Sequence, residues 1–385
     1  LNRAQIVWDN TDVTDDHVFD AVRLQVVRIL TLGLSGFDTP GSKSAMPESA
    51  VSLAALSDHL KYYQAKQQNP ALQAVLKTFA GAMSYLNANR DFDSFDRMAF
   101  ITSFGNPLSA QLLDCQKSLG IENVAVTRVL RADAPTIFEP GAFDPNAFVA
   151  WPEDRPTAAK VKLGKRLFYD PVLSANNQRS CASCHQPEKA FTDGLAKSEN
   201  IHKAGPVARN TPTILNAALQ GGQFYDLRVA NLEGQTRDVI ESKEEMHGSL
   251  KESVRKLQAD SQYMEMFKKA FPKMKDSLAP YFIQNALASY ERSLVSFDSR
   301  FDRYVRGDKP QMNAREINGF NLFMGKAKCG TCHFMPLFNG TVPPGFNKTE
   351  VEVIGVPATP QGRKIDPDLG RYRGVMVEQM KYAFK

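Results

Sequence analysis

Two short cysteine–histidine motifs constrain this chain more than any other feature of its sequence. The first runs from Cys181 to His185 and the second from Cys329 to His333, and both have the spacing Cys-x-x-Cys-His. In this spacing two thiols can add to the vinyl groups of a haem while the adjacent imidazole binds its iron. The repetition predicts two covalently bound c-type haems. Their attachment residues are Cys181, Cys184, Cys329 and Cys332, and the proximal iron ligands are His185 and His333.

Other interpretations of a Cys-x-x-Cys pair fit less well. A thioredoxin-type redox motif requires alternating strands and helices, and no such alternation surrounds either copy. The two pairs together could supply four thiolates to zinc, and each pair could form a disulfide. Neither of these requires a histidine directly after each second cysteine, so covalent haem is the favoured interpretation. The fifth cysteine, Cys115, lies in an apolar helical stretch and is expected to be buried and inert.

The composition limits the class of protein. With 385 residues and 43% apolar residues, the chain can form two or three domains with proper cores. It contains no apolar run of the length that spans a membrane, and its first residues have no signal peptide's apolar core. Since bacteria attach haem outside the cytoplasmic membrane, we expect a periplasmic protein whose export signal is absent from the sequence. The net charge of +5 comes without a basic run interleaved with aromatics, so no nucleic-acid partner is expected.

The spacing of apolar residues predicts a mainly α fold. We expect two c-type cytochrome haem domains with long loops, preceded by an all-α N-terminal domain. In the N-terminal part, apolar residues recur at helical spacing over Val18–Leu30 and Leu72–Leu86. Several prolines between residues 135 and 156 then predict a linker. The predicted domains are residues 1–145, 146–308 and 309–385, which hold the helical accessory domain, the first haem domain and the second.

Within the haem domains, helices are expected over Ala159–Tyr169, Leu250–Phe271, Pro280–Arg306 and Ala314–Lys326. A long polar loop, residues 186–210, follows the first motif, and loops of this length are often functional. A short strand is predicted over residues 351–354. The lone histidines His17 and His59 lie at amphipathic positions, where a surface or core role is expected.

Several further motifs resemble one known family. From about residue 157 onward the chain is similar to the bacterial di-haem cytochrome c peroxidases, which include the MauG-type enzymes. The motifs that carry the resemblance follow the family's order and spacing. They are Leu163–Asp170, Cys181–His185, Arg209–Ala217, Gln223–Arg228, Leu232–Gln235, Glu245–Met246 and Gly319–Phe323. The N-terminal residues lie outside the resemblance.

The resemblance implies a division of labour between the two haems. The haem on His185 would be the low-potential centre that reacts with peroxide, and the haem on His333 the high-potential centre that accepts electrons. Glu245 matches the family's catalytic glutamate on the distal side of the peroxide-reacting haem, and Gln235 matches the distal glutamine. A carboxylate in a partly desolvated pocket can take a proton from peroxide and return it to the leaving oxygen. Without the resemblance, Glu245 reads as one solvated residue in a charged run.

Three more residues gain expected roles from the resemblance. His202 lies in the loop that, in family members, carries a histidine capping the first iron in the resting enzyme; a surface histidine is the alternative. Tyr225 occupies a position where the family usually has a tryptophan that assists electron transfer between the haems, and a plain packed tyrosine is the alternative. Asn210 matches a residue that helps bind one calcium ion, for which an amide oxygen is a suitable ligand.

The resemblance also implies that the sequence ends before the family's core does. The sixth ligand of the second iron, a methionine in peroxidases and a tyrosine in MauG-type enzymes, would then lie beyond Lys385. None of Met335, Met376 and Met380 occupies the family's position for that ligand.

The expected function is reduction of hydrogen peroxide to water with electrons from a small donor protein, a cytochrome c or a cupredoxin. Two alternatives stay open: a MauG-type oxidase that modifies a partner protein, and an electron carrier without catalysis. A homodimer is compatible with each of them.

Overall fold

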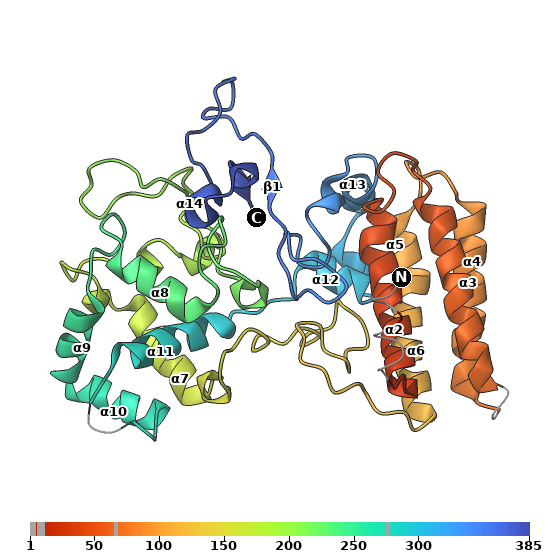
Figure 1. Cartoon of the computed structure of the whole chain (residues 1–385), viewed down its shortest axis with the longest axis horizontal. Coiled ribbons are helices and arrows are strands. Elements are labelled where there is room, and N and C mark those ends of the chain that lie inside the picture. Colours follow the sequence, from red (N-terminus) through yellow and green to blue (C-terminus); the bar gives the residue numbers. More distant parts are fainter. Residues whose placement is uncertain (1–4, 6–11, 65–67, 275–276) are drawn as a thin grey trace. The chain divides into compact units, whose positions relative to one another are not determined.

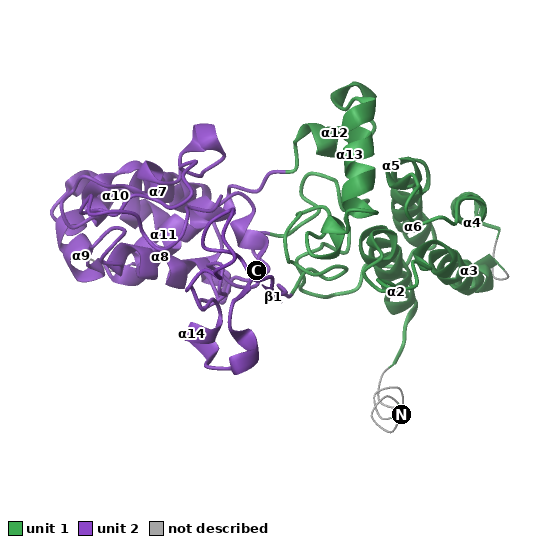
Figure 2. Ribbon diagram, turned by 90° about the horizontal axis from the view of Figure 1, so that it is seen from above, with its two compact units in different colours: residues 1–144, 297–347 green, residues 145–296, 348–385 purple. Residues whose placement is uncertain are grey.

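The structure is a computed structural model that describes residues 5, 12–64, 68–274 and 277–385. It is mainly α-helical, as expected. The chain forms two compact units, each assembled from stretches far apart in the sequence (Figure 2). Residues 1–144 and 297–347 make the first unit, and residues 145–296 and 348–385 make the second. Within the described ranges, no helix has both the length and the apolar character needed to cross a membrane.

Four long helices pack side by side in the first unit (Figure 1). Helix α3 packs on α4, α4 on α6, and α6 on α2. Their buried faces repeat at helical spacing, for example Phe19, Val22 and Val26 in α2. The bounds are α2 (Asp15–Arg28), α3 (Ala45–Gln64), α4 (Pro70–Ala88) and α6 (Asn106–Ser118), with π-helical turns at η1 (Ile29–Gly33) and η2 (Ile101–Gly105) and the short α5 (Arg97–Phe100) before η2.

The second Cys-x-x-Cys-His motif belongs to this same unit. It follows α12 (Arg300–Val305), η8 (Lys309–Gln311) and α13 (Ala314–Met324), and its first residues form the 3₁₀ turn η9 (Cys329–Thr331). Asn106 at the start of α6 donates a hydrogen bond to the carbonyl of Val305 at 2.9 Å. The helices that the sequence assigned to a separate accessory domain therefore pack with the second haem segment.

Helix α11 lies at the centre of the second unit, packed against α7, α8 and α9 (Figure 1). The first motif lies on the 3₁₀ turn η5 (Cys181–Ser183), after α7. The larger elements are α7 (Ala158–Tyr169), α8 (Leu232–Glu241), α9 (Leu250–Gln258), α10 (Ser261–Ala270), α11 (Pro280–Arg292) and α14 (Tyr372–Val375). Short 3₁₀ turns are η3 (Pro152–Asp154), η4 (Pro171–Leu173), η6 (Pro187–Lys189), η7 (Ala217–Leu219) and η10 (Glu378–Met380).

Two regions predicted as single helices are each divided in the structure. Between α9 and α10, the Asp260 side chain accepts hydrogen bonds from the amides of Gln262 and Tyr263 and so starts a new helix. Between α11 and α12, Ser299 caps the second helix through a reciprocal bond pair with Asp302. The predicted strand is shorter than expected: β1 (Glu352–Val353) pairs antiparallel with β2 (Ala383–Phe384).

The contact between α7 and α11 depends on a glycine. A Cβ added at Gly164 would collide with the carbonyl of Ala286, whose carbon would lie 2.6 Å away. Gly319 in α13 is a matched control, because a Cβ there meets nothing within 4 Å. We expect Gly164→Ala to destabilise the protein by roughly 1–3 kcal/mol. Gly319→Ala should stabilise it by roughly 0.5–1 kcal/mol. Denaturant unfolding measures both, and a neutral Gly164→Ala would contradict the close packing.

Candidate active site

The first motif presents its cysteines and histidine from one tight turn. The amide of His185 donates to the carbonyl of Cys181 at 2.9 Å, which closes the turn. The ring Nδ1 of His185 lies 3.0 Å from the carbonyl oxygen of Phe191, a residue with a left-handed φ of 61°. This hydrogen bond fixes the protonated nitrogen and leaves Nε2 as the metal-binding atom. Burial lowers the pKa of His185, which favours the neutral imidazole that iron requires.

The second motif repeats the same local geometry. The amide of His333 donates to the carbonyl of Cys329 at 3.0 Å, and its Nδ1 lies 3.2 Å from the carbonyl oxygen of Phe338, where φ is 52°. In both copies the chain then folds back on itself, through bridges between Gln186 and Thr192 and between Phe334 and Asn339. Each of the two segments thus builds its own copy of the same local arrangement, two thiols beside an oriented imidazole.

These residues fit covalently attached haem. All five cysteines are free thiols, and burial raises the pKa of Cys181 to about 12. Across the described ranges, no three His, Cys, Asp or Glu side chains gather as a metal site. Addition to a vinyl group uses the two neighbouring thiols and leaves the imidazole for iron.

Glu245 lies on a tight turn that is joined to the segment before the first motif. The turn follows α8 and is closed by the amide of His247, which donates to the carbonyl of Ser242 at 2.7 Å. The amide of Ala175 donates to the carbonyl of Met246 at 3.1 Å. Gly248 approaches the carbonyl of Leu173 so closely that a Cβ would collide with it. These contacts hold Glu245 beside the chain that leads into Cys181.

The surroundings of Glu245 suit a proton acceptor. Burial raises the pKa of its carboxyl above the usual 4.5, while Arg228, the hydroxyl of Ser242 and Arg179 oppose that rise. The carboxylate also lies near the first motif, because its charge adds to the effect of burial in raising the pKa of Cys184. A carboxyl whose pKa is raised accepts a proton more readily than an ordinary glutamate, which suits a group that takes up and returns a proton.

The structure places Gln235, Tyr225 and Asn210, the other expected site residues, as follows. Gln235 lies on α8, partly buried, without a direct hydrogen bond to Glu245 among the described contacts. Tyr225 is partly buried, and its carbonyl accepts from the amide of Lys385 at 2.8 Å. Asn210 is exposed, next to Arg209, whose guanidinium holds the carboxylates of Asp226 and Asp368 at 3.0 and 2.6 Å.

His202 belongs to a small hairpin that lies against the Glu245 turn. The hairpin is closed by a bridge between Glu199 and Pro206, and the amide of Ile201 donates to the carbonyl of Glu244 at 2.9 Å. The exposed ring of His202 meets His247, with Nε2 of the first 3.1 Å from Nδ1 of the second. The nitrogen that would cap an iron is therefore in a hydrogen bond in this structure.

Sequence reasoning missed three residues around this site. Arg179 donates from Nη1 to the carbonyls of Glu199 and Glu245, at 2.9 and 3.3 Å, and so links the hairpin to the Glu245 turn. His247 lies two residues after Glu245, and its ring meets that of His202. Glu291 is buried in α11, where burial raises its pKa to about 8 despite the neighbouring Arg292. Of these three residues, only Arg179 could have been noticed in the sequence, because it lies two residues before Cys181.

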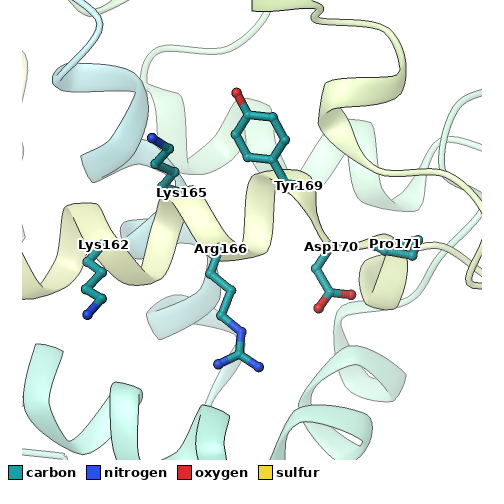
Figure 3. A pocket seen from close by; sticks show the side chains of 6 residues that line it. All are labelled: Lys162, Lys165, Arg166, Tyr169, Asp170 and Pro171. Carbon is teal, nitrogen blue, oxygen red and sulfur yellow. The ribbon is translucent and has the colours of Figure 1, made fainter.

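A hollow of about 560 Å³ lies elsewhere on the second unit, along α7 (Figure 3). Its lining residues come from the end of α7 and the turn after it: Lys162, Lys165, Arg166, Tyr169, Asp170 and Pro171. None of the candidate site residues is among them. The hollow is therefore not the site to which the motifs point.

Comparison with known proteins identifies relatives of this chain. Residues 158–310 match the family model described as di-haem cytochrome c peroxidase. The methylamine utilization protein MauG of Methylorubrum extorquens is 36% identical over 231 residues, 60% of this chain and 61% of that protein. The cytochrome c551 peroxidase of Nitrosomonas europaea is 37% identical over 186 residues, 48% of this chain and 54% of that protein.

A solved structure shows the same fold. The crystal structure of a MauG-like protein associated with microbial copper homeostasis superposes with a TM-score of 0.51 at 29% identity, covering 60% of this chain and 69% of that chain. The chain spans less than two thirds of the length of the two sequence relatives. Proteins named as peroxidases and as MauG match at similar identity, so identity alone does not separate the two activities.

Arg179 offers a direct test of the link between the hairpin and the Glu245 turn. We expect Arg179→Ala to speed hydrogen exchange at the amide of Ile201 about tenfold, because two charge-assisted hydrogen bonds are lost. Arg237→Ala is the control, since Arg237 is exposed and forms an ion pair with its neighbour Asp238. Hydrogen–deuterium exchange with mass spectrometry on peptides covering residues 196–208 measures the change. Unchanged exchange in Arg179→Ala would show that Arg179 does not hold the hairpin.

Proposed function

Because the chain belongs to the di-haem cytochrome c peroxidase and MauG family, we propose that it reduces hydrogen peroxide to water. Two electrons from a small donor protein and two protons convert one peroxide to two waters. The observation that carries the proposal is Glu245, a partly buried carboxyl with a raised pKa, held beside the segment that leads into the first motif. A simple electron carrier has no need of such a proton acceptor.

The residues present would hold two haems, one on Cys181, Cys184 and His185 and one on Cys329, Cys332 and His333. When bound, the first haem would supply the iron at which the oxygen–oxygen bond is cleaved. Glu245 as carboxylate accepts a proton from peroxide and returns it to the oxygen that leaves as water. Gln235, on the helix before the Glu245 turn, orients the peroxide through its amide.

The hairpin with His202 regulates access in the same proposal. Its contacts are the hydrogen bond between His202 and His247 and the bond from Arg179 to the carbonyl of Glu199, and release of these contacts would free the His202 imidazole to act as the cap. The proposal also includes three features that the family resemblance implies: a periplasmic location, calcium binding at Asn210, and a cytochrome c or cupredoxin as the electron donor.

One observation favours a second function. Tyr225 has a phenol at the position where the family usually has tryptophan, and a relative named MauG matches at 36% identity. A phenol can hold a radical, as an oxidase that modifies a partner protein would need. Steady oxidation of reduced cytochrome c by peroxide supports the peroxidase. Failure of that turnover, together with a peroxide-induced radical signal that disappears in Tyr225→Phe, would favour the oxidase.

The role of Glu245 is tested by its amide variant. We expect Glu245→Gln to slow the reaction of peroxide with the one-electron-reduced protein by about 100-fold or more, because general acid–base catalysis contributes on that scale. Glu241→Gln is the matched control, since Glu241 is an exposed carboxylate at the end of α8. Rapid mixing followed by haem absorbance measures the rate. Equal rates in wild type and Glu245→Gln would overturn the assignment.

The same carboxyl predicts a pH dependence. The active form of Glu245 is the carboxylate, and burial raises its pKa above 4.5. The rate of the peroxide reaction should therefore fall as the pH is lowered, with a midpoint above that of an ordinary glutamate. The rate–pH profile of the half-reduced protein measures this, with haem absorbance confirming that it remains folded. A midpoint at or below 4.5, or the same acidic limb in Glu245→Gln, would contradict the prediction.

A further inference from the structure

The N-terminal helices contact the second haem segment at several points within the first unit. At the start of α5, Asn321 from α13 accepts from the amide of Met98 at 3.0 Å and donates to the carboxylate of Asp96 at 3.0 Å. One side chain thus binds both the helix cap and the first turn of α5. This contact fixes the position of α13, the helix that leads into Cys329.

Further contacts reach the attachment turn itself. A Cβ added at Gly330, inside the motif, would lie 3.4 Å from the Cβ of Ser35. The ring of Phe37 meets Phe334 edge to face, with 5.5 Å between centroids. Lys328, the residue before Cys329, donates to the carbonyl of Pro40 at 3.1 Å. The loop that follows η1 therefore lies against both ends of the motif.

Arg97 lies at the centre of these contacts and is fully buried. Its guanidinium donates to the carbonyls of Leu34, Phe95 and Phe92, at 2.8, 3.1 and 2.7 Å. It also lies 4.5 Å from the centroid of the Phe92 ring. A Cβ added at Gly325, the residue that ends α13, would be 2.6 Å from the Cζ of Arg97. The guanidinium fills the space behind the turn that leads into Cys329.

Arg97 is a buried cation without a carboxylate on its guanidinium in the part of the chain that the structure describes. Burial lowers its pKa to about 10, with Asp93 and Asp91 opposing the change, so the side chain stays charged at neutral pH. Burying a charge is costly unless hydrogen bonds compensate it, and here three backbone carbonyls do so. The position therefore calls for a guanidinium, which has five donors in a planar fork.

We propose that the N-terminal helices form part of the second haem site: they clamp the turn that carries Cys329 and Cys332, and Arg97 is the residue that positions this turn. The inference rests on the proposed attachment of a haem to the second motif. It gives a role to helices that lie outside the matched family region. The residues involved come from the segment after η1, from the segment between α4 and α5, and from α5 itself, all of them in the first 144 residues.

The clamp has a consequence for the redox potential of the second haem. Ferric haem carries one more positive charge than ferrous haem, so a nearby buried cation favours the reduced form. Loss of Arg97 removes this cation from the unit that holds the second motif. The loss should therefore lower the midpoint potential of the second haem.

Two arginine variants test this in the full-length protein with both haems. We expect Arg97→Met to lower the midpoint potential of the second haem and to leave that of the first unchanged. Arg23→Met is the matched control: Arg23 is also buried, donates to the carbonyls of Ala132 and Ala134, and has a pKa lowered to about 10. Spectroelectrochemical titration resolves the two haems. Hydrogen exchange over residues 322–334 should be at least about fivefold faster in Arg97→Met only.

Asn321→Asp carries the test if Arg97→Met does not fold. The added carboxylate would face Asp96 and should loosen the same contact and lower the same potential. The proposal is overturned if a folded variant keeps the second haem's potential and exchange as in wild type, or if Arg23→Met shifts them equally. A wild-type protein with only one haem would instead refute the proposed function, and a haem count by pyridine haemochrome separates the two failures.

Discussion

The hydrogen bond from a motif histidine to a backbone carbonyl organises both candidate haem sites. His185 and His333 each point Nδ1 at the carbonyl of a phenylalanine in left-handed conformation, five or six residues on. The bond orients the imidazole, selects its tautomer and requires the chain to fold back directly after the motif. That fold-back sets where the following segments begin. After the first motif the chain enters the hairpin with His202 and the region that leads to α8 and the Glu245 turn.

The two motifs have different neighbours, and this difference is the basis for assigning different roles. The first is joined to a turn with a carboxyl of raised pKa and to a hairpin with two histidines in contact. The second is packed against the N-terminal helices through Asn321, Arg97 and Ser35. A proton acceptor beside the first motif suits peroxide chemistry, whereas a turn clamped by neighbouring helices suits a centre that holds and passes on electrons.

Much of this could be predicted from the sequence where the signal is local. The spacing of Cys181–His185 and Cys329–His333 predicted two haem sites, and helical periodicity located most helices. The divisions at Asp260 and Ser299 were missed because a single capping residue outweighed a continuous apolar pattern. The packing of residues 15–118 on the second haem segment is nonlocal and left no periodic signal. In the sequence, Arg97 looks like a surface arginine. Only the structure shows that it is buried and that three backbone carbonyls accept its hydrogen bonds.

The proposed peroxide chemistry requires an open reactive position at the first haem site in the protein reduced by one electron. Low-temperature electron paramagnetic resonance of the protein reduced by one electron tests this claim directly. The account predicts a high-spin ferric signal from the haem on His185, which Glu245→Gln leaves in place because Glu245 is not an iron ligand. A half-reduced protein that shows only low-spin ferric haem would contradict the account and would favour an electron carrier with both irons six-coordinate.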